Sequence, residues 1–234
     1  MTPIGGLIFD FDGLILDTET PAFQSWQEIY QEHGCTFSLD AWAVALGTAD
    51  HGFDPCAALE AQISRTLDHA ALRARRQARK DVLMAELVLL PGVVDYIDTA
   101  KRLDLRLGVA SSSPRSWVEH YLAGFGLLNF FECVSCVEDV PRAKPDPALY
   151  QRTLASLGLR PEEAIAFEDS PNGITAARAA GIFCVAVPNA ITCRLPVEHA
   201  DLHLASLAEI PLDALLRHVD AVRSLQPPVE EHPA

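Results

Sequence analysis

The chain alternates between short stretches that are almost entirely apolar and longer stretches with helical periodicity. The apolar stretches cover residues 5–9, 105–110, 164–167 and 182–187, and helical patterns at 114–123, 146–157 and 171–180 lie between the last three of them. Short stretches without polar alternation are typical of strands buried on both faces of a parallel sheet. We therefore predict an α/β fold with a Rossmann-like parallel sheet and helices on both faces.

The interval from residue 20 to residue 89 breaks this alternation. It has no convincing buried strand, but it has helical patterns at residues 23–32, 39–46, 56–66 and 68–87. An interval of roughly 70 residues is far longer than an ordinary connection in an α/β unit. We predict an inserted helical cap domain at residues 17–88 and a core formed by residues 1–16 and 89–234, with hinges at 14–18 and 89–92.

Composition excludes several classes of protein. Apolar residues make up 49% of the 234 residues, and 32 acidic against 18 basic residues give a net charge of −14. This acidity disfavours a nucleic-acid partner, and no apolar run is long enough to cross a membrane. Because the N-terminus lacks the pattern of a secretion signal, we expect the six cysteines to stay reduced in the cytoplasm. We also expect a monomer.

Polar side chains that could take part in catalysis or binding follow three of the apolar stretches. They are Asp10 and Asp12 after the first, Ser111 and Ser112 after the second, and Glu168 and Asp169 after the third. The carboxyl ends of parallel strands meet at one edge of a sheet, so we expect these residues, together with Lys144, to converge there. Four carboxylates so close together could not all ionise without a cation, and hard oxygen ligands suit Mg²⁺. The pattern predicts a metal-and-phosphate site.

Four ordered motifs resemble those of the haloacid dehalogenase (HAD) superfamily. They are Asp10-x-Asp12-Gly13 with Asp17-Thr18-Glu19, the segment 109–113, Lys144-Pro145, and the segment 167–173 that ends at Gly173. With a helical cap after the first motif, the chain is most similar to the β-phosphoglucomutase-like branch. The resemblance implies an enzyme, a Mg²⁺-dependent phosphatase that hydrolyses a phosphate ester of a small metabolite such as a sugar phosphate.

The resemblance also implies catalytic and substrate-binding roles for five residues. Asp10 would attack phosphorus and form an aspartyl-phosphate. Asp12 would protonate the leaving alcohol and then deprotonate the hydrolytic water. Ser111 and Ser112 would bind the phosphoryl oxygens, and Lys144 would offset the charge between Asp10 and the phosphoryl group.

The metal ligands come from the same resemblance. Asp10, Asp169 and the backbone carbonyl of Asp12 would ligate Mg²⁺, and Glu168 would hold it directly or through water.

Three other activities compete with this interpretation. Dehalogenases of the superfamily lack the second aspartate and bind no metal, so Asp12 disfavours them. In the mutases, a histidine occupies the position of Ala22 and an arginine lies in the cap loop, whereas residues 46–50 here contain no arginine. A non-catalytic phosphate-binding protein would not need a nucleophile and an acid together.

The helical pattern at 68–87 carries a run of basic residues in this acidic chain: Arg73, Arg75, Arg76, Arg79 and Lys80. Such charges usually form a solvated helix face, which we expect here. The alternative is that Arg73 or Arg76 faces the cleft and attracts anionic substrates. Trp26 and Trp42 lie at helical spacing, and we expect both in the core of the cap.

Overall fold

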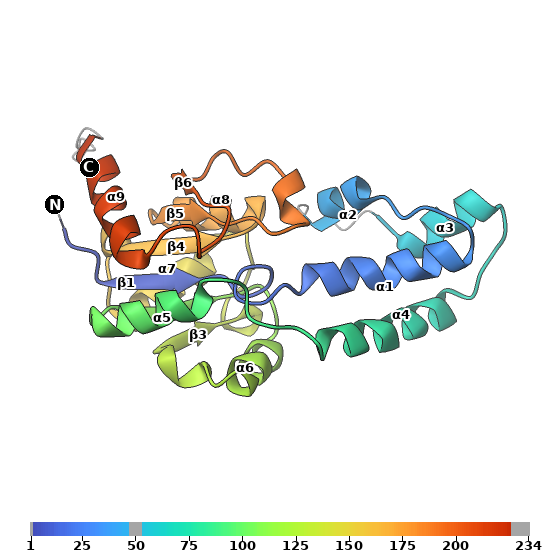
Figure 1. Cartoon of the computed structure of the whole chain (residues 1–234), viewed down its shortest axis with the longest axis horizontal. Coiled ribbons are helices and arrows are strands. Elements are labelled where there is room, and N and C mark those ends of the chain that lie inside the picture. Colours follow the sequence, from blue (N-terminus) through green and yellow to red (C-terminus); the bar gives the residue numbers. More distant parts are fainter. Residues whose placement is uncertain (1, 47–52, 226–234) are drawn as a thin grey trace.

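The computed structural model describes residues 2–46 and 53–225 and contains a six-stranded parallel sheet in the order β3-β2-β1-β4-β5-β6 (Figure 1). The strands are β1 (Gly6–Phe9), β2 (Arg106–Ala110), β3 (Cys133–Ser135), β4 (Ala164–Glu168), β5 (Phe183–Ala186) and β6 (Leu202–His203). The four predicted apolar stretches are the four central strands, and the short strands β3 and β6 lie at the edges. The predicted α/β fold is confirmed.

Helices cover both faces of the sheet, as predicted. Alternate side chains of β1 enter separate apolar clusters, with Leu7 and Phe9 on one face and Ile8 on the other. The first face packs against α5 (Val93–Arg102), α6 (Arg115–Gly124) and α9 (Leu212–Leu225), and the second against α7 (Ala148–Leu157) and α8 (Pro171–Ala179). The sequence patterns predicted α6, α7 and α8 but not α5 or α9.

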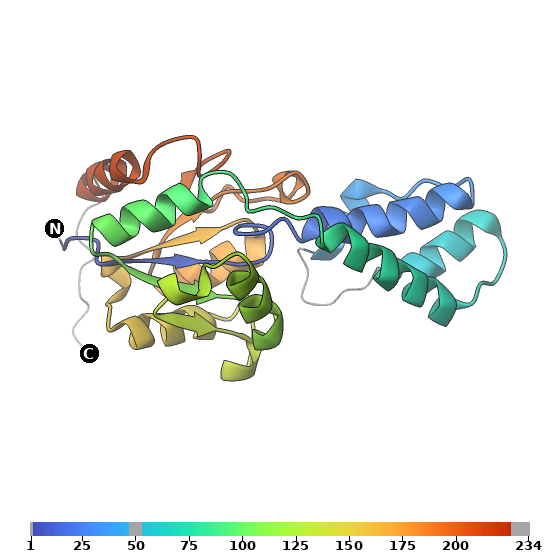
Figure 2. The same ribbon diagram turned by 60° about the horizontal axis from the view of Figure 1, so that its bottom comes forward.

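In the described part of the insertion, four helices lie between β1 and α5. They are α1 (Glu19–Glu32), α2 (Leu39–Leu46), α3 (Pro55–Ile63) and α4 (His69–Met84). Figures 1 and 2 show them as a separate group that extends the molecule beyond the sheet, with α1 and α4 side by side. The group has an apolar cluster of its own, which includes Trp26, Tyr30 and Phe37. The cluster takes in residues of the insertion and, from the core, Ile191 and Leu195 of the loop after β5.

The two chain segments that join the insertion to the core lie next to each other. Leu16 forms an isolated β-bridge with Leu89, and the amide of Leu90 donates to the carbonyl of Ile15 at 3.0 Å. A hinge at this place stays a prediction. A third connection comes from the loop after β5, where Ile191 joins the apolar cluster of the insertion.

Within residues 2–46 and 53–225, none of the helices combines the length and apolar character that a membrane crossing requires.

Candidate functional site

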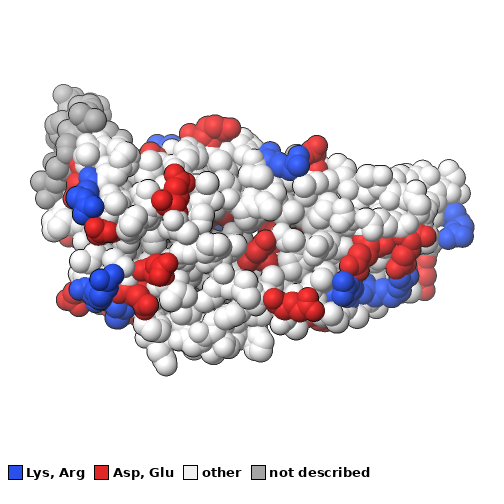
Figure 3. Space-filling model, in the orientation of Figure 1, with Lys and Arg blue, Asp and Glu red and all other residues white. Residues whose placement is uncertain are grey.

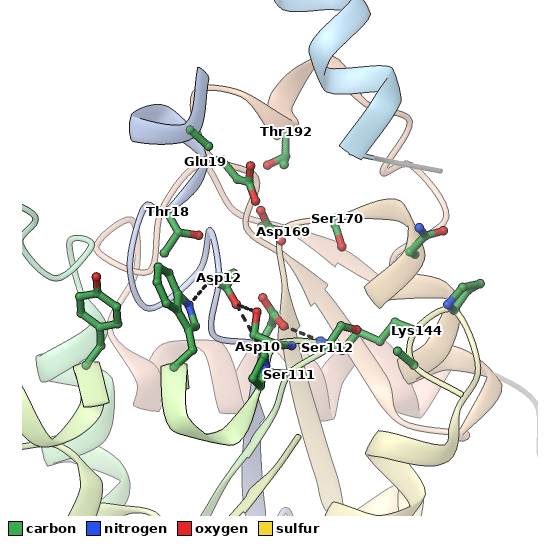
Figure 4. A pocket seen from close by; sticks show the side chains of 18 of the residues that line it. Asp10, Asp12, Thr18, Glu19, Ser111, Ser112, Lys144, Asp169, Ser170 and Thr192 are labelled. Atoms are coloured by element: carbon green, nitrogen blue, oxygen red, sulfur yellow. Dashed lines mark hydrogen bonds and ion pairs between the residues drawn. The ribbon is translucent and has the colours of Figure 1, made fainter. Parts of the chain in front are cut away.

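The predicted site residues lie at the carboxyl ends of the strands. Asp10 directly follows β1, Ser111 follows β2 and Asp169 follows β4, while Lys144 arrives from the loop before α7. These four line one cavity of about 1630 Å³ that also reaches residues of the four-helix insertion (Figure 4). The structure therefore brings together residues that are as far apart in sequence as the four motifs.

Three carboxylates form a tight buried cluster, and two of them, Asp10 and Asp169, line this cavity. Asp10, Glu168 and Asp169 each offer one oxygen, and these oxygens all lie within 4.8 Å of one another. The ammonium of Lys144 lies 2.5 Å from Oδ1 of Asp10 and 2.6 Å from Oε1 of Glu168. One ammonium cannot balance three carboxylates, so the cluster has room for further positive charge.

The pKa values reflect this imbalance. Burial, together with repulsion from Glu168 and Asp12, raises the pKa of Asp10 to about 8, although Lys144 attracts it. Burial and repulsion from Asp10 likewise raise the pKa of Asp169 well above its usual value. Burial alone would lower the pKa of Lys144, but the two carboxylates beside it outweigh burial and raise it. Without a bound cation, the cluster retains protons that a metal ion could displace.

Glu168 is fully buried and both of its oxygens already accept hydrogen bonds. Oε1 accepts from Lys144 and from the Tyr150 hydroxyl at 2.6 Å, and Oε2 accepts from the Asp169 amide and the Ser170 hydroxyl. The side chain also explains the glycine that ends the fourth motif, because a Cβ on Gly173 would lie 1.9 Å from its carboxyl carbon. The first turn of α8 must therefore begin without a side chain at this position.

Asp12 lies beside the cluster, but its carboxylate accepts hydrogen bonds from residues that do not belong to the cluster. Oδ2 accepts from the Ser113 hydroxyl at 2.6 Å, and Oδ1 accepts from the indole N–H of Trp117 at 2.9 Å. The turn after it needs Gly13, which has φ +85° and where a Cβ would lie 2.2 Å from Oδ2 of Asp169. The carboxylate is therefore held at the cavity wall by donors from the loop after β2 and from α6 (Figure 4).

The two predicted phosphate-binding serines differ in exposure. Ser111 is buried, and its Oγ accepts from the Ser113 amide at 3.0 Å, which curls the loop around it. Ser112 is exposed and lines the cavity. Both line the cavity that contains Asp10.

The sequence analysis missed Asn189, in the loop after β5. Its side-chain amide donates to Oδ2 of Asp169 at 2.8 Å and to the Gly13 carbonyl at 3.1 Å. Its own Oδ1 accepts from the amides of Ile191 and Thr192, which fixes the orientation of the side chain. Asn189 follows a predicted strand by two residues, so the rule that found Ser111 could have found it. Trp117 gave no comparable signal.

The basic residues of α4 lie in two different environments. Arg73 is exposed and pairs with Asp54 at 3.1 Å, as a solvated helix face predicts. Arg76 and Lys80 line the cavity, so the expected solvated face was wrong for these two and the cleft-facing alternative is confirmed for Arg76. The comparison with the mutases also used the cap loop at residues 46–50. Residues 47–50 of this loop lie outside the described residues.

Two further cavity residues come from the insertion. Trp26 is buried in the core of the insertion, as predicted, and Trp42 packs partly buried against that core and also lines the cavity. Glu19, at the start of α1, lies above Asp12 and Asp169 in Figure 4. Burial and the neighbouring Asp12 carboxylate raise the pKa of Glu19 to about 7, against the attraction of Lys80 and Arg76.

Comparisons with known proteins agree with this geometry. Residues 7–187 match the family model described as haloacid dehalogenase-like hydrolase. YhcW of Bacillus subtilis (strain 168), a candidate phosphatase, is 45% identical over 218 residues, covering 93% of this chain and 99% of the relative. The fructose-1-phosphate phosphatase YqaB of Escherichia coli (strain K12) is 32% identical over 184 residues, covering 78% of this chain and 95% of the relative.

The chain is also similar to a solved structure. The crystal structure of CbbY from Rhodobacter sphaeroides in complex with phosphate has a TM-score of 0.66 and 30% sequence identity. The match covers 88% of this chain and 96% of CbbY.

Proposed function

The chain belongs to the haloacid dehalogenase-like hydrolases, and from this premise we propose that it is a Mg²⁺-dependent phosphatase acting on a small phosphorylated carbohydrate. One observation carries the proposal: Asp10, Ser111, Lys144 and Asp169 line one cavity, and the buried Glu168 completes the acidic cluster beside it. The phosphatase names of two relatives, and the phosphate bound to CbbY, support it.

The proposed reaction has two steps with Asp10 as the nucleophile. In the first, an oxygen of Asp10 attacks phosphorus while the ester bond breaks, and Asp12 gives its proton to the departing alcohol. In the second, Asp12 takes a proton from water, which attacks the aspartyl-phosphate and releases inorganic phosphate. Ser111, Ser112 and Lys144 bind the phosphoryl oxygens, and Trp117 positions Asp12 through its indole N–H.

The side chains present fit a bound Mg²⁺. We propose that Asp10, Asp169 and the carbonyl of Asp12 hold the ion directly. Glu168 would act through water, because both of its oxygens already accept two hydrogen bonds. When bound, the ion neutralises charge on the transferring phosphoryl group.

We further propose that residues 17–88 act as a cap domain whose closure excludes water and large substrates. The wall that this segment contributes includes Ala22, which lines the cavity where a mutase would carry a histidine. A methyl group cannot exchange a proton with a rotating sugar intermediate, so Ala22 supports hydrolysis over mutase activity.

Phosphate release from a panel of sugar phosphates and other small phosphate esters tests the proposal. With Mg²⁺ we expect release from some esters and none after chelation, because the uncompensated carboxylates would repel the phosphoryl group. Faster conversion of glucose 1-phosphate to glucose 6-phosphate than release of phosphate would show a mutase instead.

Replacing Asn189 with alanine should weaken Mg²⁺ binding by about 10- to 100-fold, the usual effect of losing a hydrogen bond that orients a metal ligand. Without the amide, Asp169 loses the donor that fixes its Oδ2. Isothermal titration of Mg²⁺ measures the effect, with exposed Asn129→Ala as the control. An Asn189→Ala variant with wild-type Mg²⁺ affinity would show that Asn189 does not orient Asp169.

A further inference from the structure

The cap helix α4 carries basic residues of two kinds. Three of them are exposed and form ion pairs: Arg73 with Asp54, Arg75 with Glu32 and Arg79 with Glu28. Figure 3 shows the result as blue and red side chains next to each other over α1 and α4. The charges of these three arginines are balanced within the insertion itself.

Arg76 and Lys80 differ from the other three in their burial, their position and their lack of an ion pair. They lie one helical turn apart, are half-buried and line the cavity that contains Asp10. Burial lowers the pKa of both groups. Neither forms an ion pair with any carboxylate in residues 2–46 and 53–225. Buried cations are normally paired, so the two lack the partner that their position calls for.

Their neutral contacts leave donors unused. The guanidinium of Arg76 lies 5.9 Å from the ring centre of Trp26 and donates from Nη2 to the Ala22 carbonyl at 3.2 Å. Its Nε is buried and has no acceptor in the described part of the chain, and the same holds for Nε1 of Trp42, which lines the same cavity. Buried donors in native proteins nearly always have an acceptor, so a ligand is the natural source of one here.

Nearby carboxylates do not supply it. Glu19 and Asp81 attract both cations, and Asp12 attracts Lys80, but none lies within the 4.0 Å of an ion pair. Glu19 lines the cavity with them and carries at most one negative charge. Because none of these carboxylates contacts either cation, the two positive charges of Arg76 and Lys80 stay available for contact with an anionic ligand.

The position of Lys80 shows which end of a substrate these cations would meet. Its ammonium lies 5.1 Å from the ring centre of Trp117, and the indole N–H of Trp117 donates to Asp12. Asp12 is the proposed acid for the leaving alcohol, whereas Lys144 and Ser111 lie toward the phosphoryl group. Arg76 and Lys80 therefore lie on the leaving-group side of the cavity.

We propose that Arg76 and Lys80 form a second anion-binding subsite, which takes a phosphate or carboxylate carried by the leaving-group part of the substrate. The assignment of a leaving-group side rests on the proposed phosphatase function. The subsite narrows the substrate class to phosphate esters that carry a second anionic group. A neutral monosaccharide monophosphate would leave both cations without a partner.

Matched substrate pairs test the subsite. Fructose 1,6-bisphosphate is compared with fructose 1-phosphate, and 2-phosphoglycolate with ethyl phosphate, so that each pair adds only a second phosphate or a carboxylate. We expect the wild-type kcat/KM to favour the member with the second anionic group, in at least one pair, by about tenfold or more, as charged hydrogen bonds to an anion contribute. The pair with the larger ratio identifies which anion the subsite takes.

The double variant Arg76→Gln/Lys80→Gln should reduce this ratio to near one. The control is Arg75→Gln/Arg79→Gln, which removes two positive charges from the same helix and should leave the ratio unchanged. A ratio near one for both pairs in the wild type would overturn the subsite, as would a ratio that the double variant retains. Circular dichroism shows whether the double variant folds, and the single variants replace it if it does not.

A binding measurement separates this proposal from the phosphatase assignment. In an Asp10→Asn background, titration calorimetry compares the affinities of the same ligand pairs without turnover. Tighter binding of the ligand with the second anionic group, lost with Arg76→Gln/Lys80→Gln, supports the subsite even if no ester is hydrolysed. Equal affinities for both members of each pair would overturn it. Absence of phosphate release from every ester would count against the phosphatase alone.

Discussion

Asp10→Asn is expected to abolish phosphate release, with a loss of about 10⁴-fold or more, as is usual when a nucleophile is removed. Asparagine has nearly the same shape as aspartate and can still accept from Lys144. It lacks the anionic oxygen that would attack phosphorus, so no aspartyl-phosphate can form. Steady-state phosphate release with the best ester of the panel measures the loss, and exposed Asp95→Asn serves as the control.

The same variant should fold at least as well as the wild type in the absence of Mg²⁺. The pKa of Asp10 is raised to about 8 from the usual 3.8, so the folded state binds its proton more tightly than the unfolded state. Stability from this group is therefore fully present below about pH 3.8 and is lost as the pH rises through 8, because the folded state has to keep a proton that the unfolded state releases. A neutral amide removes that cost.

Thermal unfolding at pH 7 in chelator distinguishes a lost nucleophile from a lost fold. An unfolding temperature equal to or above that of the wild type, with no turnover, is the expected pair of results. Residual turnover within tenfold of the wild type would remove Asp10 from the role of nucleophile. A large drop in unfolding temperature would show that its pairing with Lys144 outweighs the cost of its burial.

Lys144→Met should have the second-largest effect, on both stability and activity. The ammonium is the buried cation between Asp10 and Glu168, and its side chain is only 6% exposed. Removing one partner from a buried ion pair typically costs about 3–5 kcal/mol, because the remaining charges lose their compensation. Activity should fall at least about 100-fold, since Lys144 also neutralises charge on the phosphoryl group.

Mg²⁺ should restore part of the stability of Lys144→Met, because a second cation can balance the same carboxylates. Urea unfolding with and without Mg²⁺ measures this, and exposed Lys101→Met is the control. If Mg²⁺ stabilises the variant no more than the wild type, the ion does not bind among Asp10, Glu168 and Asp169. Unchanged stability in chelator would show that protonation of the carboxylates replaces the lysine without cost.

The strands, and the candidate catalytic and metal-binding residues that follow them, could be recognised in the sequence because each depends on a short local pattern. A strand buried on both faces is apolar almost throughout, so the four central strands could be recognised, and the polar residues after three of them could be picked out. The four motifs could be identified from their order along the chain, without knowledge of the packing: they contain Asp10, Ser111, Lys144 and Asp169. The long helical insertion was equally visible, since its length is incompatible with a simple connection.

Tertiary structure alone decided which side chains of one helix belong to the site. Arg73, Arg75, Arg76 and Arg79 are chemically alike in sequence, but the packing of α4 against α1 leaves only Arg76 and Lys80 facing the cavity. The hydrogen bonds of Asn189 to Asp169, and of Trp117 to Asp12, join segments that lie 20 and 105 residues apart. Local sequence fixes residue type and secondary structure, whereas the orientation of a side chain depends on the distant segments packed around it.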